Sequence, residues 1–122
     1  MVDLPALHRL VLALPEAENG SDPQKLAFSV RGKSFAWTYL ERVQPKAPRR
    51  PRLDVLAVRC TLEKKEMLIA AAPDRFFDDD HYLGYRAVLV RLDAICEDEL
   101  AGLLADAWAM AAPPAQVKLR DG

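Results

Sequence analysis

Five cationic side chains lie close together in the stretch RVQPKAPRRPR, residues 42–52, which also holds three prolines and no acid. Lys and Arg bind the phosphates of nucleic-acid backbones, and proline keeps the chain extended, so that the cations are held apart. The same composition is typical of a solvated loop that discourages pairing between sheet edges, and the sequence alone leaves these two interpretations even. The five cations are Arg42, Lys46, Arg49, Arg50 and Arg52.

Aromatic side chains form a second candidate surface, at Phe28, Phe35, Trp37 and Tyr39. Aromatic residues on a sheet can stack unpaired bases. Alternation at a period of two more often marks the buried face of a strand, and this interpretation is favoured for Phe28 and Phe35. Trp37 and Tyr39 remain candidates for an exposed patch, which would suit a protein partner equally well.

An acidic cluster, Asp78, Asp79, Asp80 and His81, is the nearest approach to a metal or acid–base site. Such side chains bind divalent cations or act as general bases. EF-hand and HExxH spacing is absent, so a solvated loop is the favoured interpretation. Glycine motifs for nucleotide binding and for a hydrolase nucleophile are also absent. We therefore expect no enzymatic activity, no cofactor and no bound metal.

Two cysteines, Cys60 and Cys96, lie far apart without CxxC spacing, which argues against a zinc ligand set and a redox motif. Free cysteine behaves as a small apolar residue. We therefore expect both thiols to be unpaired and buried in the core.

Composition and charge limit the classes of protein to which the chain can belong. Just over half of the 122 residues are apolar, enough for one domain to bury a core without metals or disulfides. Residues 1–60 carry ten Lys or Arg against six acids, whereas residues 61–122 carry seven against twelve. The first residues do not resemble a signal peptide, and no apolar run is long enough to span a membrane. We expect a cytoplasmic protein without membrane association, with one domain at 1–113 and a mobile tail at 114–122.

Hydrophobic periodicity predicts the elements that carry these residues. A helix follows the N-cap candidate Asp3 with Leu7, Leu10, Val11 and Leu14 on one face, and residues 16–24 are an exposed connection. A hairpin joins strands at 26–30 and 35–39 through a type II′ turn at Gly32-Lys33. A strand covers 53–60.

The second half of the chain is predicted in the same way. Thr61 caps a helix that ends near Ala72 and offers Leu62, Met67, Leu68 and Ala71 to the core. Residues 74–85 form a loop pinned by Phe76 and Phe77, followed by a strand at 86–93 and a helix from Glu97. The order α-β-β-β-α-β-α, with one further strand possible near Tyr82, predicts an α+β fold with a single antiparallel sheet and helices packed on it.

Five stretches of the chain form a recognisable combination: LALPEAENG, FSVRGKSFAW, APDRFF, YLGYRAVLVRLD and DELAGLLADAWAMAAP. In these stretches the chain resembles the MmcQ/YjbR-like family of small bacterial proteins. This resemblance implies a cyaY-like or secretion-chaperone-like fold and, through an arrangement described as a double wing, DNA binding. The resemblance implies no catalytic residue. Gly32 and Lys33 match a family position with a surface role. For Gly32, the favoured explanation of the glycine is the geometry of the turn. The 42–52 stretch resembles a local elaboration.

The favoured interpretation is a non-enzymatic cytoplasmic protein that binds DNA weakly and without strong sequence preference. It would use the five cations of 42–52 with help from Arg31 and Lys33. The alternative is a protein-interaction adaptor with Trp37 and Tyr39, or the acidic loop, at its docking surface. A metal or small-molecule binder at Asp78–His81 is less favoured. We expect a monomer or a weak dimer.

Overall fold

The computed structural model describes residues 2–21, 25–41, 50–79, 82 and 84–112, and residues 40, 41 and 50–53 by their backbone alone. The described elements are α1 (Leu4–Leu12), β1 (Ala17–Asn19), β2 (Ala27–Val30), β3 (Lys33–Glu41), β4 (Arg50–Arg59), α2 (Leu62–Ala71), β5 (Phe76–Phe77), β6 (Ala87–Arg91) and α3 (Glu97–Ala111). The predicted tail at 114–122 lies outside the described residues.

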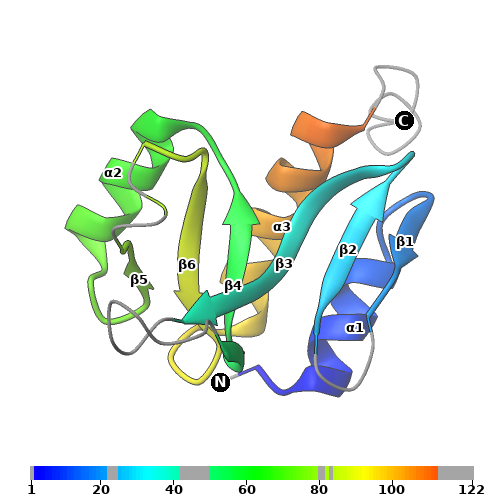
Figure 1. Ribbon diagram of the computed structural model, residues 1–122, viewed down its shortest axis with the longest axis horizontal. Helices are drawn as coiled ribbons and strands as arrows, with labels where there is room; N and C mark the ends of the chain where they lie inside the picture. The colour runs from blue at the N-terminus through cyan, green and yellow to red at the C-terminus, as the bar shows by residue number, and fades with distance from the viewer. Residues whose placement is uncertain (1, 22–24, 42–49, 80–81, 83, 113–122) are drawn as a thin grey trace.

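The strands form one open sheet in the order β1-β2-β3-β4-β6-β5, and every neighbouring pair is antiparallel. Helices α1 and α3 pack behind this sheet in the view of Figure 1, and α2 lies beside β5 and β6. The predicted α+β class and the order of the longer elements are thus confirmed.

The sheet has two differently covered faces. One face packs on α3, where Trp108 and Phe35 are fully buried and Leu68 of α2 reaches the same core. The opposite face, here called the open face, carries a smaller cluster around Tyr39, Tyr82 and Leu89. None of the described helices covers it.

Helix α1 begins as predicted. The Asp3 carboxylate accepts a hydrogen bond from the Ala6 amide at 2.9 Å, so one of the unpaired N–H groups at the helix start is satisfied. Leu7 and Val11 are buried against α3. Trp108 of α3 donates its indole N–H to the Pro15 carbonyl at 2.9 Å, which ties the end of α1 to the last helix.

Helix α2 begins at the predicted cap, but the side chains that it turns toward the protein interior differ from the predicted ones. The Thr61 hydroxyl accepts from the Lys64 amide at 3.1 Å. Leu62, Met67 and Ala71 are exposed, contrary to the prediction, whereas Lys65 is buried. The helix lies at the sheet's edge, so its inner face meets the connection between β5 and β6 as well as apolar core.

Two short edge strands were not predicted. Residues 17–19 pair with β2, although the prediction was an exposed connection, and Phe76–Phe77 pair with β6, although the prediction was a loop. Both are too short to show a period of two, and their pairing depends on neighbours distant in sequence. Tyr82 itself lies in a turn, and the described residues next to it form no strand.

The hairpin between β2 and β3 has a different turn from the predicted one. Val30 pairs with Lys33, which makes Arg31 and Gly32 the two central residues. Both have positive φ, 51° and 79°, as a type I′ turn requires. Gly32 adopts this conformation at little cost, whereas a residue with a side chain such as Arg31 is strained in it.

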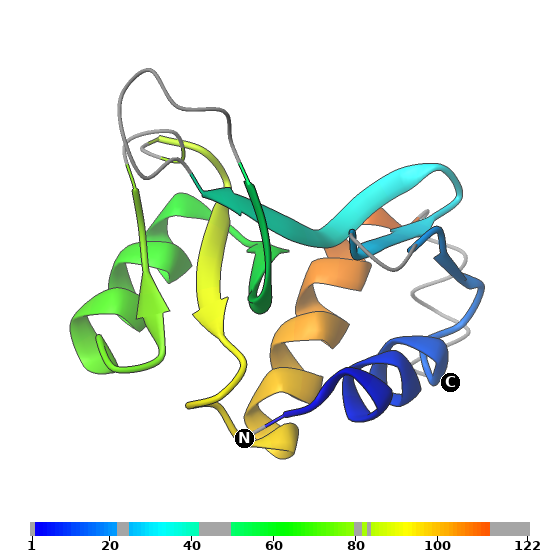
Figure 2. The same cartoon turned by 60° about the horizontal axis from the view of Figure 1, so that its bottom comes forward.

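Beyond the sheet, β3 and β4 continue together as a two-stranded ribbon. Their register shifts between Thr38 and Tyr39, after which Tyr39 pairs with Arg52 and Glu41 with Arg50. β4 pairs with β6 only from Val55 onward, so within the described residues this ribbon, 39–41 with 50–52, pairs only with itself. In Figure 2 it lies on the side away from α1 and α3. We call it the ribbon arm.

None of the helices in the described residues is long and apolar enough to cross a membrane.

Candidate functional site

The ribbon arm carries part of the predicted basic stretch. Arg50 and Arg52 lie in β4, where only their backbone is described; this strand begins three residues earlier than predicted. The remaining cations, Arg42, Lys46 and Arg49, lie outside the described residues. In the sequence, these three residues belong to the connection between the end of β3 at Glu41 and the start of β4 at Arg50.

The other two predicted cations lie at the opposite end of β3. Arg31 is a turn residue whose side chain pairs with Glu16 at 2.7 Å, and Lys33 is exposed at the start of the strand. Eight residue steps separate Lys33 from Glu41, and at about 3.3 Å per residue this is about 26 Å. Such a distance exceeds the roughly 8 Å Debye length of physiological salt. The described end of β3 at Glu41 is therefore too far from Lys33 for direct electrostatic coupling between the two ends of the strand.

Five aromatic side chains gather on the open face; we call them the aromatic cluster. Tyr82 is central: its ring lies 6.0 Å from Tyr39 and 5.8 Å from Tyr85. Its hydroxyl oxygen accepts a hydrogen bond from the Trp37 indole N–H at 3.2 Å. The cluster consists of Trp37, Tyr39, Phe77, Tyr82 and Tyr85.

Within this cluster, the two aromatics predicted as a partner surface are largely covered. Tyr39 is only 6% exposed, and its hydroxyl donates to Asp79 Oδ2 at 2.5 Å. Trp37 is half-buried, with the Tyr85 ring edge-on at 6.1 Å. The exposed member is instead Tyr85, at 51%, which the sequence analysis did not single out.

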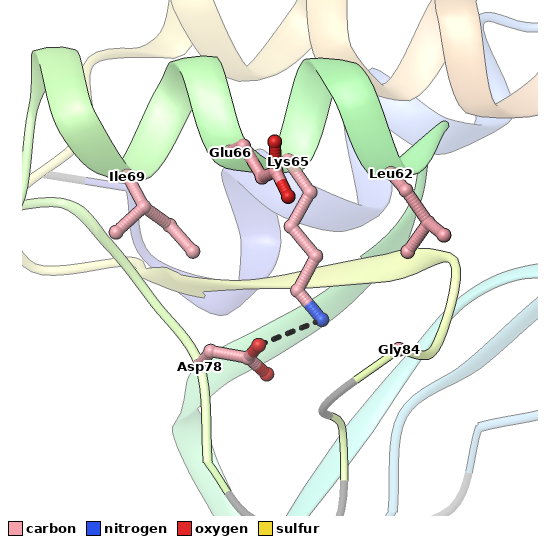
Figure 3. Close-up of a pocket in the computed structure, with 6 residues that line it drawn as sticks. All are labelled: Leu62, Lys65, Glu66, Ile69, Asp78 and Gly84. Carbon is pink, nitrogen blue, oxygen red and sulfur yellow. Dashed lines mark ion pairs between the residues drawn. The ribbon is translucent and has the colours of Figure 1, made fainter.

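Buried Lys65 fixes the backbone that carries this exposed tyrosine. Its ammonium donates to the Tyr82 carbonyl at 2.6 Å and to the Tyr85 carbonyl at 3.1 Å. It also pairs with Asp78 Oδ2 at 3.0 Å, as Figure 3 shows. Lys65 is 3% exposed. An ammonium has three donors, and these three contacts match that number. Lys65 thus joins α2 to the connection between β5 and β6.

A cavity of about 210 Å³ lies beside this ion pair, between α2 and the connection that follows β5. Leu62 and Ile69 form its apolar walls, and Glu66 and Gly84 complete the lining with the pair itself. Because the Lys65 ammonium is occupied by protein oxygens, the cavity offers a bound molecule mainly apolar contact.

Two arginines flank the aromatic cluster on the open face. Arg91 of β6 pairs in register with Val55, and its guanidinium carbon lies 4.1 Å from the Phe77 ring centroid. Arg59 of β4 pairs with Ala87 and donates from Nε to the Ser34 carbonyl at 2.9 Å. Each pairs with a strand residue that belongs to the open-face cluster, so both side chains project from that face.

The acidic cluster is engaged in structure where it is described. Asp78 pairs with Lys65, and Asp79 accepts hydrogen bonds from Tyr39 and from the Tyr82 amide at 3.0 Å. Asp80 and His81 lie outside the described residues. In the part of the chain that the structure describes, no group of three or more His, Cys, Asp or Glu side chains is arranged to hold a metal ion.

The cysteines differ in burial. Cys60 is buried as expected, and burial raises the pKa of its thiol above the ordinary value, with Lys65 and Lys64 opposing that shift. Cys96 is exposed at the N-cap position of α3, so the expectation of a core thiol is wrong for this residue. The helix was predicted to start at Glu97, but the position of Cys96 as its exposed N-cap residue was not recognised.

Sequence reasoning missed Lys65, Tyr85 and Arg91. A lysine in the middle of a helix is ordinarily a surface residue, so nothing local marks Lys65 as buried. The tyrosine follows a glycine in an acidic, irregular stretch, which reads as loop. Arg91 ends a strand in the sequence, and its contact with Phe77 depends on the unpredicted pairing of β5 with β6.

Comparison with known proteins identifies relatives of the chain. The model of the YjbR family matches residues 12–110. The crystal structure of Deinococcus radiodurans protein DR2400, described by its domain DUF419, superposes with a TM-score of 0.67 and 23% identity, covering 98% of this chain and 88% of that one. At this identity the likeness concerns the fold.

Two mycobacterial proteins match part of the sequence. Uncharacterized protein Rv2570 of Mycobacterium tuberculosis and uncharacterized protein Mb2600 of Mycobacterium bovis are each 44% identical over 64 residues, which is 52% of this chain and 50% of theirs. The match therefore spans about half the length of these curated relatives, and their descriptions assign no activity.

Proposed function

Because this chain belongs to the YjbR family, whose matched relatives are uncharacterized, we propose its function from its own geometry: it binds nucleic acid through the ribbon arm, without catalysis. The binding is electrostatic, directed at backbone phosphates and largely independent of base sequence. Such contacts give dissociation constants of about 10⁻⁴ to 10⁻⁶ M at physiological salt.

One observation carries this proposal: β3 and β4 leave the sheet as a ribbon that pairs only with itself among the described residues. Two-stranded ribbons fit the major groove of a duplex. Residues 42–52, which comprise the connection between β3 and β4 and the first residues of β4, include five cations and no acid. The arm therefore joins a shape that enters a groove to a charge that binds phosphates.

The hairpin cations have a secondary role in this proposal. About 26 Å separates Lys33 from the end of β3, so Arg31 and Lys33 would meet a different part of a bound strand. Arg31 is also paired with Glu16, which lowers its attraction for phosphate.

Fluorescence anisotropy with labelled duplex and single-stranded DNA at low salt tests the proposal. One variant combines Arg42→Ser, Lys46→Ser and Arg49→Ser; a matched control combines Arg9→Ser, Lys25→Ser and Arg86→Ser, which changes the net charge equally. We expect the first variant to bind at least tenfold more weakly and the control to stay within about threefold of the wild type. Absence of wild-type binding at low salt, or equal loss in both variants, contradicts the proposal.

An adaptor function would rest on an exposed apolar face at Trp37 and Tyr39. Tyr39 is buried and hydrogen-bonded, and Trp37 is half-buried, so neither gives this alternative the exposed area it needs. The nucleic-acid proposal is therefore preferred.

A further inference from the structure

We infer that the open face stacks an unpaired base on Tyr85, beside Trp37, so that the protein binds single-stranded nucleic acid in addition to the duplex bound by the arm. This inference rests on the proposed function, because the arm supplies the phosphate contacts that hold the strand. To the proposed function it adds the aromatic cluster as a second contact surface and single-stranded nucleic acid as a class of ligand.

Tyr85 offers the exposed aromatic area. Its ring is half exposed and meets the rings of Trp37 and Tyr82 edge-on, with interplanar angles of 85° in both contacts. Every base has a π-face, so stacking on such a ring tolerates any sequence. The residues paired directly with Trp37, Ala27 and Ala57, are small, so they cover little of its half-buried ring.

Lys65 holds this exposed ring in place. Placing a charged group in the interior is rarely the most stabilising choice for a fold, and its attested use is to specify one arrangement. Here two of the three contacts go to the carbonyls of Tyr82 and Tyr85, the residues that border the aromatic surface. A tyrosine on a fixed backbone loses less conformational freedom when it binds a ligand than one on a loose loop.

The charge of the open face suits a polyanion. Arg59 and Arg91 project from it on either side of the aromatic cluster. Beside the cluster, Asp79 accepts hydrogen bonds from Tyr39 and the Tyr82 amide, Asp78 pairs with Lys65, and Glu18 lies at the far edge on β1. The two arginines therefore give a bound polyanion cationic contacts beside the rings.

The aromatic surface is continuous with the arm. Trp37 precedes Tyr39, the first residue of the arm, by two positions, which is about 7 Å along a strand. A strand held by its phosphates at the arm would thus place neighbouring bases at Trp37 and Tyr85. A duplex keeps its bases stacked on one another and has none to offer this surface.

Tryptophan fluorescence provides a direct test with a ten-residue oligothymidylate and an abasic ten-mer that has the same phosphates. The protein has two tryptophans, and Trp108 is fully buried, so quenching by a stacked base reports on Trp37. A ten-residue oligouridylate, run in parallel, distinguishes RNA from DNA as the source of the strand. Variants Tyr85→Ser and Tyr85→Phe are compared with Met67→Ser, which removes a similarly exposed side chain on α2.

We expect the oligothymidylate to quench the fluorescence and to bind at least about fivefold more tightly than the abasic strand, the lower range for one base–aromatic stack. Tyr85→Ser removes that preference, while Tyr85→Phe and Met67→Ser retain it. Equal affinity for both strands, or a preference unchanged in Tyr85→Ser, overturns the inference while leaving binding by the arm intact. If neither strand binds the wild type, the proposed function fails and the inference fails with it.

Discussion

Lys65 is the residue with the most demanding environment in the described structure, because its charge is buried and each contact depends on a distant part of the chain. Its partner Asp78 is mostly shielded as well. Removing one member of a buried pair leaves the other without compensation, which costs far more than the pair contributes to stability.

We predict that Lys65→Met lowers the free energy of unfolding by about 3 kcal/mol, as measured by urea denaturation. Lys64→Met is the matched control on the same helix, since Lys64 pairs with the exposed carboxylate of Asp106. The control should lose no more than about 1 kcal/mol. Equal losses in both variants would mean that the contacts of Lys65 contribute no more than a surface pair.

The two thiols should differ in reactivity. We predict that Cys96 reacts with a thiol reagent in the folded protein, whereas Cys60 reacts only when the protein opens, because Cys60 is buried and its pKa is raised. Mass spectrometry after timed alkylation at pH 8 measures both rates. Alkylation of Cys60 as fast as that of Cys96 would contradict the structure.

The raised pKa also gives a pH dependence with a definite sign. In the folded state the Cys60 thiol keeps its proton to higher pH than in the unfolded chain, so its contribution to stability is complete below the ordinary thiol pKa of 9.0. That contribution is lost as the pH rises through the folded-state pKa. Cys60→Ala should therefore reduce the decline of stability at alkaline pH.

At the scale of the elements, the turn between β2 and β3 is a strained connection. Arg31 has a positive φ and is not a residue that favours it. We predict that Arg31→Asn, which gives the Asn-Gly pair preferred in type I′ turns, raises the free energy of unfolding by up to about 1 kcal/mol. Gly32→Ala should lower it by about 1 kcal/mol, for strain rather than for space, since nothing lies within 4 Å of an added Cβ. Urea denaturation of both variants measures the difference, and a stabilising Gly32→Ala would contradict the turn.

Elements with local signals were predictable from the sequence. The caps at Asp3 and Thr61 and the acidic first turn of α3 depend on residues within one helical turn, and all three are present. The strands β1 and β5 have two or three residues, so their existence depends on β2 and β6 rather than on their own composition. The turn was misplaced by one residue because its type follows from strand register, which the sequence does not display.

Some features of the candidate site were likewise predictable from local sequence, and others were not. Its cations and two of its aromatics could be identified from type and spacing, but the burial of Tyr39 and the exposure of Tyr85 could not. Both depend on the connection after β5 folding back over the open face, where Asp79 meets Tyr39 across 40 positions of sequence. Contacts of this kind have no counterpart in a local pattern.

At the scale of the whole molecule, the helices and the open face differ in charge. Exposed acids such as Glu97, Asp98 and Asp106 lie on α3, whereas Arg59 and Arg91 project from the open face. The arm leaves the sheet on the side away from α1 and α3. Under the proposed function, this difference would orient a polyanion toward the open face.

The salt dependence of duplex binding tests the central claim, binding by the arm, most directly. Each phosphate neutralised contributes about −0.9 to the slope of log affinity against log salt, so the variant without Arg42, Lys46 and Arg49 should have a slope smaller in magnitude by up to about 2.7. The control variant without Arg9, Lys25 and Arg86 should differ from the wild type by less than about 1. A slope that falls equally in both variants, or stays unchanged when the three arm cations are removed, would contradict the account.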